Sequence, residues 1–152
     1  MSYDLVVFDP EVAPREREAF LAWFQQQTQW SEDHSYADPI VTTPALQGWY
    51  EAIRRDYPNM NGPGAADDDH IDEAVDYCIG SNIIYAAFRW SQAEEVYPIV
   101  RRLAVEHGTG FYDVSGDEGD GEIYFPGDQL GPPSGGAWRE VAKQFRDLEN
   151  GQ

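Results

Sequence analysis

The residues whose types could do chemistry lie first of all in an irregular stretch at residues 28–42. Glu32, Asp33 and His34 follow one another closely there, and a general acid and a general base could be drawn from them. Trp30 and Tyr36 flank them, and aromatic side chains beside acids are also typical of the centres of protein interfaces. A loop of this length can instead be packed by its own aromatic residues. Local packing is favoured over recognition, and recognition over catalysis, because the spacing defines no set of nucleophile, base and orienting group.

The densest acidic run of the chain follows a glycine- and asparagine-rich loop at residues 59–64. Hard divalent cations bind several carboxylate oxygens, but adjacent acids in one loop cannot converge on an ion without strain, and EF-hand spacing is missing. We expect a solvated loop or the first turn of a short helix, where the helix dipole favours acids. A contact surface for a basic partner is the second interpretation and a metal site the third. The partner-binding candidates in this run are Asp67, Asp68, Asp69, Asp72 and Glu73.

A second acidic stretch, at residues 113–122, has the alternating acids of a calcium-binding loop. Counted from Asp113, the sixth position is Glu118 rather than glycine, and the twelfth is Tyr124 rather than glutamate. The tight turn and the bidentate ligand of an EF-hand loop are therefore both missing. A charged hairpin tip is the better interpretation, and such a tip could enter the cleft of a partner. The partner-binding candidates here are Asp117, Glu118 and Asp120.

The other reactive side chains predict no catalytic, metal or cofactor site. His34, His70 and His107 share no metal-ligand spacing. His107 is expected in the last turn of a helix, where an imidazolium complements the helix dipole. Cys78 falls in an expected strand with no histidine near it in sequence, which favours a buried, unreactive thiol over a nucleophile.

Hydrophobic periodicity and turn residues predict the elements that position these stretches. Pro14 is expected as a first helical residue, and a capping box formed by Ser91 and Glu94 is expected to open a helix that Gly108 ends. The expected strands are 5–8, 75–79, 83–88, 111–114 and 122–125, and the expected helices are 14–27, 43–57, 91–107 and one that begins near Ser134. This order predicts an α+β fold: a ferredoxin-like split β-α-β sandwich, with one antiparallel sheet backed by helices and an extra C-terminal helix.

The composition predicts one globular domain, residues 1–152, with a large negative charge. The chain has 28 Asp and Glu against 10 Lys and Arg, a formal net charge of -18, and it is 41% hydrophobic. A magnitude of roughly 2–8 is enough for the solubility of a small domain, so the excess suggests a use for a negative surface. Nucleic acid and anionic membranes are not expected as direct partners, because both require a cationic patch. A single cysteine and the lack of a signal segment or apolar span favour a cytoplasmic protein.

Four stretches carry a resemblance that covers most of the chain: residues 2–9, 30–32, 60–63 and 84–93. In them the chain is similar to a group of small bacterial proteins of unassigned activity, and none of the four is a catalytic signature. In size and acidity the chain also resembles the immunity proteins that bacteria make against secreted toxin domains. No functional residue follows from this second likeness, which rests on general character.

Charge and likeness together predict an acidic binding protein that neutralises a basic toxin or effector domain by occluding its active site. Carboxylates would take the place of substrate phosphates, and opposite potentials would speed association. Two alternatives remain open. One is a small enzyme or ligand-binding protein that uses the loop at residues 30–38, and the other is an acidic surface that adapts the protein to salty surroundings.

Overall fold

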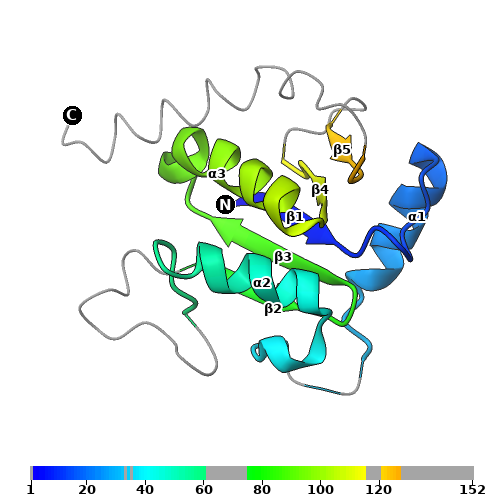
Figure 1. Cartoon of the computed structure of the whole chain (residues 1–152), viewed down its shortest axis with the longest axis horizontal. Helices are drawn as coiled ribbons and strands as arrows, with labels where there is room; N and C mark the ends of the chain where they lie inside the picture. Colours follow the sequence, from blue (N-terminus) through cyan, green and yellow to red (C-terminus); the bar gives the residue numbers. More distant parts are fainter. Residues whose placement is uncertain (1, 33, 35, 61–74, 116–120, 128–152) are drawn as a thin grey trace.

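The computed structural model of the chain describes residues 2–32, 34, 36–60, 75–115 and 121–127. These residues form an α+β fold with one five-stranded antiparallel sheet and three α-helices (Figure 1). The elements are β1 (Tyr3–Phe8), α1 (Arg17–Gln27), the 3₁₀ turn η1 (Pro39–Val41), α2 (Pro44–Ile53), β2 (Asp76–Ile79), β3 (Ile83–Phe88), the 3₁₀ turn η3 (Trp90–Gln92), α3 (Ala93–His107), β4 (Gly110–Tyr112) and β5 (Ile123–Tyr124).

The sheet has the strand order β2-β3-β1-β4-β5, and every neighbouring pair is antiparallel. The strand β1 lies at the centre, and all of its residues except Asp4 are hydrophobic and buried. Val6, for example, faces Tyr85 on one side and Tyr112 on the other. The hairpin of β2 and β3 follows the sequence prediction, and its register pairs Cys78 with Tyr85.

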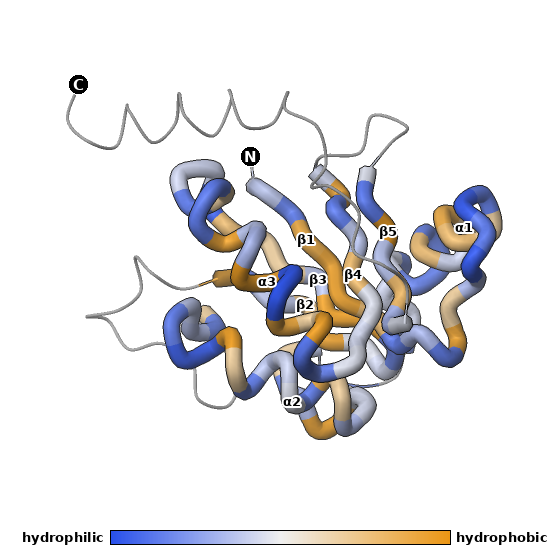
Figure 2. The backbone as a smooth tube through the Cα atoms, turned by 45° about the horizontal axis from the view of Figure 1, so that its top comes forward, coloured by the Kyte–Doolittle hydropathy of each residue, from blue (hydrophilic) through white to orange (hydrophobic). Residues whose placement is uncertain are grey.

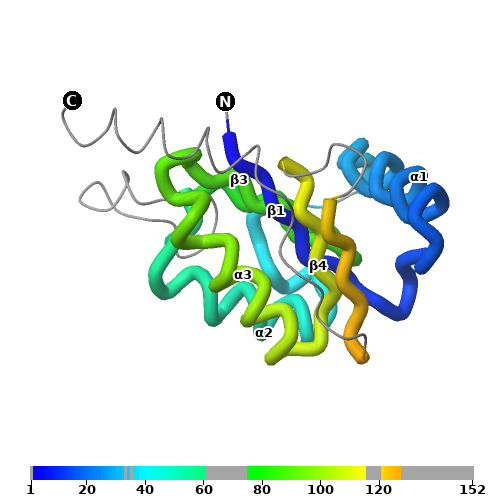
Figure 3. Tube along the Cα trace, turned by 90° about the horizontal axis from the view of Figure 1, so that it is seen from above, coloured from blue at the N-terminus to red at the C-terminus, as the bar shows by residue number. Residues whose placement is uncertain are grey.

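Helices cover both faces of the sheet, whereas the sequence predicted helices without assigning faces to them. Figure 3 shows α2 and α3 on one side of the strands and α1 on the other. The alternation of side chains along each strand produces two clusters of buried residues. The larger cluster joins Leu5 and Val7 to α2 and α3, and the smaller joins Val6 and Phe8 to α1. In Figure 2 the hydrophobic stretches of the backbone gather on the strands between these layers.

Two predicted helix starts are wrong, and a side-chain cap explains the first of them. The first helix begins at Arg17 rather than Pro14, because the Glu16 carboxylate caps it by accepting the N–H groups of Glu18 and Ala19. The third begins after the turn η3, with Gln92 at its N-cap in place of the predicted Ser91. The predicted cap of α2 is confirmed, since Thr43 Oγ1 accepts the N–H of Leu46 at 3.2 Å. The expected C-terminal helix lies outside the described residues.

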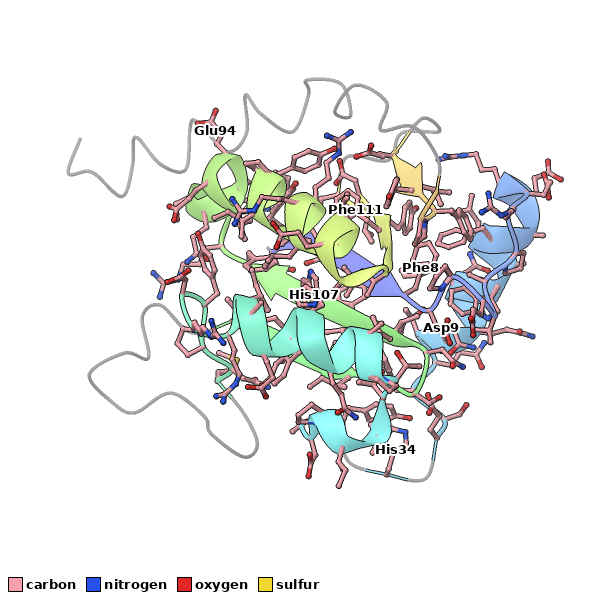
Figure 4. The ribbon with its side chains drawn as sticks, viewed as in Figure 1. Phe8, Asp9, His34, Glu94, His107 and Phe111 are labelled. Carbon is pink, nitrogen blue, oxygen red and sulfur yellow. The ribbon has the colours of Figure 1, made fainter. Side chains whose placement is uncertain are left out.

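The helices α2 and α3 approach each other closely at a glycine. A Cβ atom on Gly48 would lie 2.9 Å from Nδ1 of His107, so the imidazole occupies the space that a side chain would need. His107 stands in the last turn of α3, as predicted, and Gly108 ends the helix with a φ of 71°. Figure 4 shows His107 between α2 and α3. His34 lies apart from it, on the loop that precedes η1 and α2 in the chain.

Candidate functional site

The loop that carries Trp30 and Tyr36 is packed by its own aromatic residues. The ring centroids of Trp30 and Tyr36 lie 5.2 Å apart, nearly edge to face. The Tyr36 hydroxyl accepts the N–H of Glu32 at 2.6 Å and donates to the Glu32 carbonyl at 3.1 Å. His34 closes the cluster, with its ring centroid 4.8 Å from that of Tyr36. The structure therefore brings together both predicted anchors and two of the three candidate acid–base residues, Glu32 and His34, while Asp33 lies outside the described residues.

This loop is fixed to the turn between β2 and β3. The Glu32 carboxylate accepts the N–H of Ser81 at 3.1 Å, and Nε2 of His34 lies 2.8 Å from the same Oε1 atom. The N–H of Ile79 donates to the carbonyl of Tyr36 at 2.7 Å. A Cβ atom on Gly80 would lie 3.1 Å from Glu32 Oε2, so the glycine makes room for the carboxylate. The loop and the hairpin thus form one continuous surface.

The contacts of Glu32 with Ser81 and His34 make its carboxylate an anchor of the loop, and its pKa agrees with that role. Burial alone would raise the pKa, but the hydrogen bonds from Ser81 and His34 outweigh it and hold the pKa below its usual 4.5. A general acid or base at neutral pH works best with a pKa near 7. Glu32 is therefore poorly suited to proton transfer and well suited to holding the loop on the hairpin.

Replacing Glu32 with glutamine is expected to lower the free energy of unfolding at pH 7 by about 1–2 kcal/mol, because two hydrogen bonds to a charged group are weakened. A lowered folded-state pKa contributes stability above the unfolded pKa, and this stability is lost as the pH falls through the folded value. The difference between the two proteins should therefore shrink below about pH 4.5, the usual pKa of the group. Urea unfolding of both proteins at a series of pH values measures this difference in the free energy of unfolding.

Glu51→Gln is the matched control, because Glu51 is exposed and pairs with nearby Arg54, only three residues further on at the C-cap of α2. Glu51→Gln should lower the free energy of unfolding by less than about 0.5 kcal/mol. A Glu32→Gln deficit that stays constant from pH 7 to pH 3 would show that the Glu32 charge does not stabilise the loop.

A groove lies beside this loop, on the face of the sheet that α1 covers only in part. Its volume is about 450 Å³. One wall comes from the end of α1, from Trp30 and from the ring of Tyr85. The floor comes from the other lining residues of β2 and β3, which point away from α2 and α3. We call it the aromatic groove. Its lining residues are Phe24, Thr28, Trp30, Asp76, Cys78, Tyr85 and Ala87.

Three aromatic rings form the wall of the aromatic groove. The rings of Phe24 and Tyr85 are nearly parallel, with centroids 6.3 Å apart, and Trp30 meets Tyr85 edge to face at 6.3 Å. The Tyr85 hydroxyl donates to the Asp4 carboxylate at 2.5 Å, which fixes the tilt of the ring. All three rings are partly exposed, whereas the strand residues on the other face, such as Tyr77 and Ile84, are buried. The groove therefore has a rigid, accessible aromatic wall.

The backbone of Trp30 is held in an unfavourable conformation. Its φ of 53° lies in the left-handed region, and among the described residues it is the one non-glycine residue with a positive φ. Such a conformation costs about 1–3 kcal/mol in a bulky residue and is concentrated at binding and catalytic sites. The contacts of the ring with Tyr36 and Tyr85 hold it in place. No pattern in the sequence signals this strain.

Cys78 lies on the floor of the groove and is only partly buried, in contrast to the buried thiol that the sequence predicted. Burial, and to a lesser extent the neighbouring Asp76 carboxylate, raise the pKa of the Cys78 thiol to about 11. At neutral pH the thiol is therefore protonated and a weak nucleophile. The prediction that it is unreactive is consistent with this pKa.

The structure places two of the ten predicted partner-binding residues, Trp30 and Tyr36, and it puts them at one site. The other eight fall within residues 61–74 and 116–120, outside the described residues, so their position on one face stays a prediction. They are Asp67, Asp68, Asp69, Asp72, Glu73, Asp117, Glu118 and Asp120.

Sequence reasoning missed Phe24, Asp76, Tyr85 and Ala87 as groove residues. The alternation of side chains along β2 and β3 does indicate part of the groove. Asp76, Tyr85 and Ala87 stand at positions that share one face of the sheet, the face that α1 covers in part. Recognising a groove there also requires knowing that α1 crosses that face.

Neither a metal site nor a membrane span is found in the part of the chain that the structure describes. Within it, no three histidine, cysteine or acidic side chains are grouped so that they could hold a metal ion. Its helices are all too short or too polar to cross a membrane. Comparison of the chain with protein families, with curated proteins and with solved structures found no match.

Proposed function

We propose that this protein is an acidic cytoplasmic binding protein that neutralises a basic toxin or effector domain of bacteria by occluding its active site. The observation that carries the proposal is the placement of Trp30 and Tyr36 beside an accessible aromatic groove, in a chain with a net charge of -18. Aromatic side chains in a concave site supply most of the energy of many interfaces. Surplus carboxylates supply the attraction and the specificity for a basic surface.

The composition supports the view that the negative charge is not balanced within the fold. The chain has 28 Asp and Glu against 10 Lys and Arg, so basic side chains are too few to neutralise the acids one for one. Self-repulsion between such acids destabilises a compact protein. A basic partner would relieve that repulsion, which favours association over a purely structural role for the charge.

Capture and inhibition test this function. The full chain, immobilised, is used to capture partners from the native host, and the captured protein is then assayed for its own enzymatic activity. We expect a basic protein whose activity is abolished by one equivalent of the full chain. A captured protein that retains full activity when saturated with this chain would contradict neutralisation.

A ligand-binding protein is the second candidate, and the volume of the groove favours it. Its volume of about 450 Å³ lies within the range of small-molecule sites, which is roughly 300–1,000 Å³. A smaller hollow of about 190 Å³ lies next to it, lined by Ser31, Glu32, Ser81 and their neighbours. An enzymatic role gains less support, because Glu32 has a lowered pKa and is held by Ser81 and His34.

We also propose that the core of the fold is a ferredoxin-like split β-α-β sandwich. The order β2-β3-β1-β4 with antiparallel neighbours supports this, as does the position of α2 before β2 and of α3 before β4 on one face. In this interpretation α1 and β5 are additions to the core. An experimental structure that aligns β1 to β4, α2 and α3 with a ferredoxin-like domain would test it.

A further inference from the structure

We propose that the aromatic groove is the site at which this protein holds an arginine side chain of its protein partner. The inference rests on the proposed function in one respect, namely that the partner is a basic protein. It adds the location of the contact and the chemical group that is bound. The occupant is inferred from the floor of the groove, from its wall and from the absence of basic side chains among the residues that line it.

The floor of the groove is acidic because of how three strands are aligned. Ala87 of β3 faces Asp76 of β2 on one side and Asp4 of β1 on the other. Directly opposed residues of antiparallel strands share a face, with Cβ atoms about 4.5–5.5 Å apart. Two carboxylates therefore stand on either side of a methyl group, and the small Ala87 leaves open space between them. Asp76 is exposed at the edge of this space.

The two carboxylates have different roles. Asp4 accepts the hydroxyl of Tyr85 through Oδ2 and that of Ser2 through Oδ1, so it is part of the frame that orients the aromatic wall. Asp76 projects from the edge strand β2 and lines the groove itself. A guanidinium in the groove would meet the carboxylate of Asp76 at one end and lie within the field of Asp4.

The wall of the groove fits a flat cation. A guanidinium is planar, is weakly hydrated, stacks on aromatic faces and bonds a carboxylate through two N–H groups. Cation–π attraction operates within about 6 Å of a ring centroid and is strongest with tryptophan. Phe24, Trp30 and Tyr85 offer three rings around one space. The methylene groups of an arginine would cover Ala87 and Cys78, both of which line the groove.

The test uses three short peptides that need no identified partner: acetyl-Gly-Arg-Gly-amide, the same peptide with lysine, and the same peptide with citrulline, which keeps the shape of arginine without its charge. Each is titrated into the ¹⁵N-labelled full chain at low ionic strength and followed by NMR. We expect the arginine peptide to shift the indole N–H of Trp30 and the amides of Cys78 and Tyr85, with a dissociation constant of about 1 mM. The lysine peptide should bind several times more weakly, and the citrulline peptide should cause no saturable shift.

Two variants separate a local site from attraction to the net charge. Asp76→Asn removes the carboxylate of the groove and should lower the affinity for the arginine peptide about tenfold. Asp56→Asn makes the same change in net charge at an exposed position after α2, on the other side of the sheet, and should change the affinity less than twofold. Ala87→Ile keeps the charge but fills the groove with a residue that favours strands. It should abolish the shift of the Trp30 indole.

The inference is overturned if Asp76→Asn and Asp56→Asn weaken binding equally, if the citrulline peptide binds as well as the arginine peptide, or if the shifts gather away from the groove. The outcome of the peptide titration does not depend on whether the protein neutralises a toxin. A basic partner that is neutralised equally well by the wild type and by Ala87→Ile would remove the groove from the interface and leave neutralisation standing. Arginine binding in the groove without any neutralised partner would do the reverse.

Discussion

Replacing Gly110 with alanine is expected to lower the free energy of unfolding by about 3 kcal/mol, the upper part of the range for overpacked cores. Gly110 opens β4 and faces Phe8 of β1, and the Phe8 ring lies over it. A Cβ atom at Gly110 would lie 2.1 Å from Cε2 of Phe8. The ring cannot move away, because Phe20 and Phe125 pack against it with centroids 4.9 Å and 5.2 Å away. The midpoint temperature of thermal unfolding should fall by about 6–12 °C.

A double-mutant cycle tests whether the Phe8 ring is the cause. In a Phe8→Leu background the side chain at position 8 is smaller and more adaptable, so the added methyl group has room. The cost of Gly110→Ala should then fall below about 1 kcal/mol, since contacting residues couple by about 0.5–3 kcal/mol. If the two changes add without coupling, the contact between Phe8 and Gly110 does not explain the need for glycine.

Replacing Arg101 with methionine is expected to lower the free energy of unfolding by about 3 kcal/mol, because it leaves a largely buried carboxylate without its charged partner. Arg101 of α3 donates to both carboxylate oxygens of Glu122, at 2.8 Å from Nε and 2.7 Å from a terminal nitrogen. Tyr97 donates to the same carboxylate at 2.7 Å. The side chains of Arg101 and Glu122 are only 16% and 11% exposed. This cluster attaches the start of the short strand β5 to α3.

Arg102 provides the matched control, one position along the same helix. Its pair with Glu106 is 3.7 Å long, with side chains 64% and 56% exposed. Arg102→Met should therefore cost less than about 0.5 kcal/mol. Chemical denaturation of the two variants under the same conditions measures the difference. Equal midpoints for Arg101→Met and Arg102→Met would contradict a stabilising role for the Glu122 cluster.

Strong local signals made much of the fold predictable from the sequence. The apolar run before Asp9, the Thr43-Pro44 start of α2 and the Gly108 end of α3 all lie where the sequence placed them. The hairpin of β2 and β3 was also predicted, because residues 80–82 separate two stretches rich in β-branched and aromatic residues. The starts of two helices were predicted less accurately. The helix α1 begins at Arg17, after its Glu16 cap, rather than at Pro14, and η3 stands where the capping box of α3 was expected.

The candidate site was predictable only in part, because it depends on tertiary structure. The aromatic and acidic character of residues 30–36 identified Trp30 and Tyr36, which the structure brings together. Nothing local connects these residues to Phe24, Asp76 or Tyr85, since the groove exists only where α1 and the loop meet the outer face of the sheet. The constraint on Gly110 has the same origin: it depends on a ring that lies about a hundred residues away in the chain.

The dependence of association rate on salt tests the central claim, that a negative surface draws this protein to a basic partner. The rate constant for binding of the full chain to its captured partner is measured by stopped flow across a range of ionic strengths. As the Debye length falls from about 30 Å to about 3 Å between about 0.01 M and 1 M salt, screening should lower this rate constant from about 10⁸ M⁻¹s⁻¹ to about 10⁶ M⁻¹s⁻¹. A rate constant that stays level across this range would contradict the account.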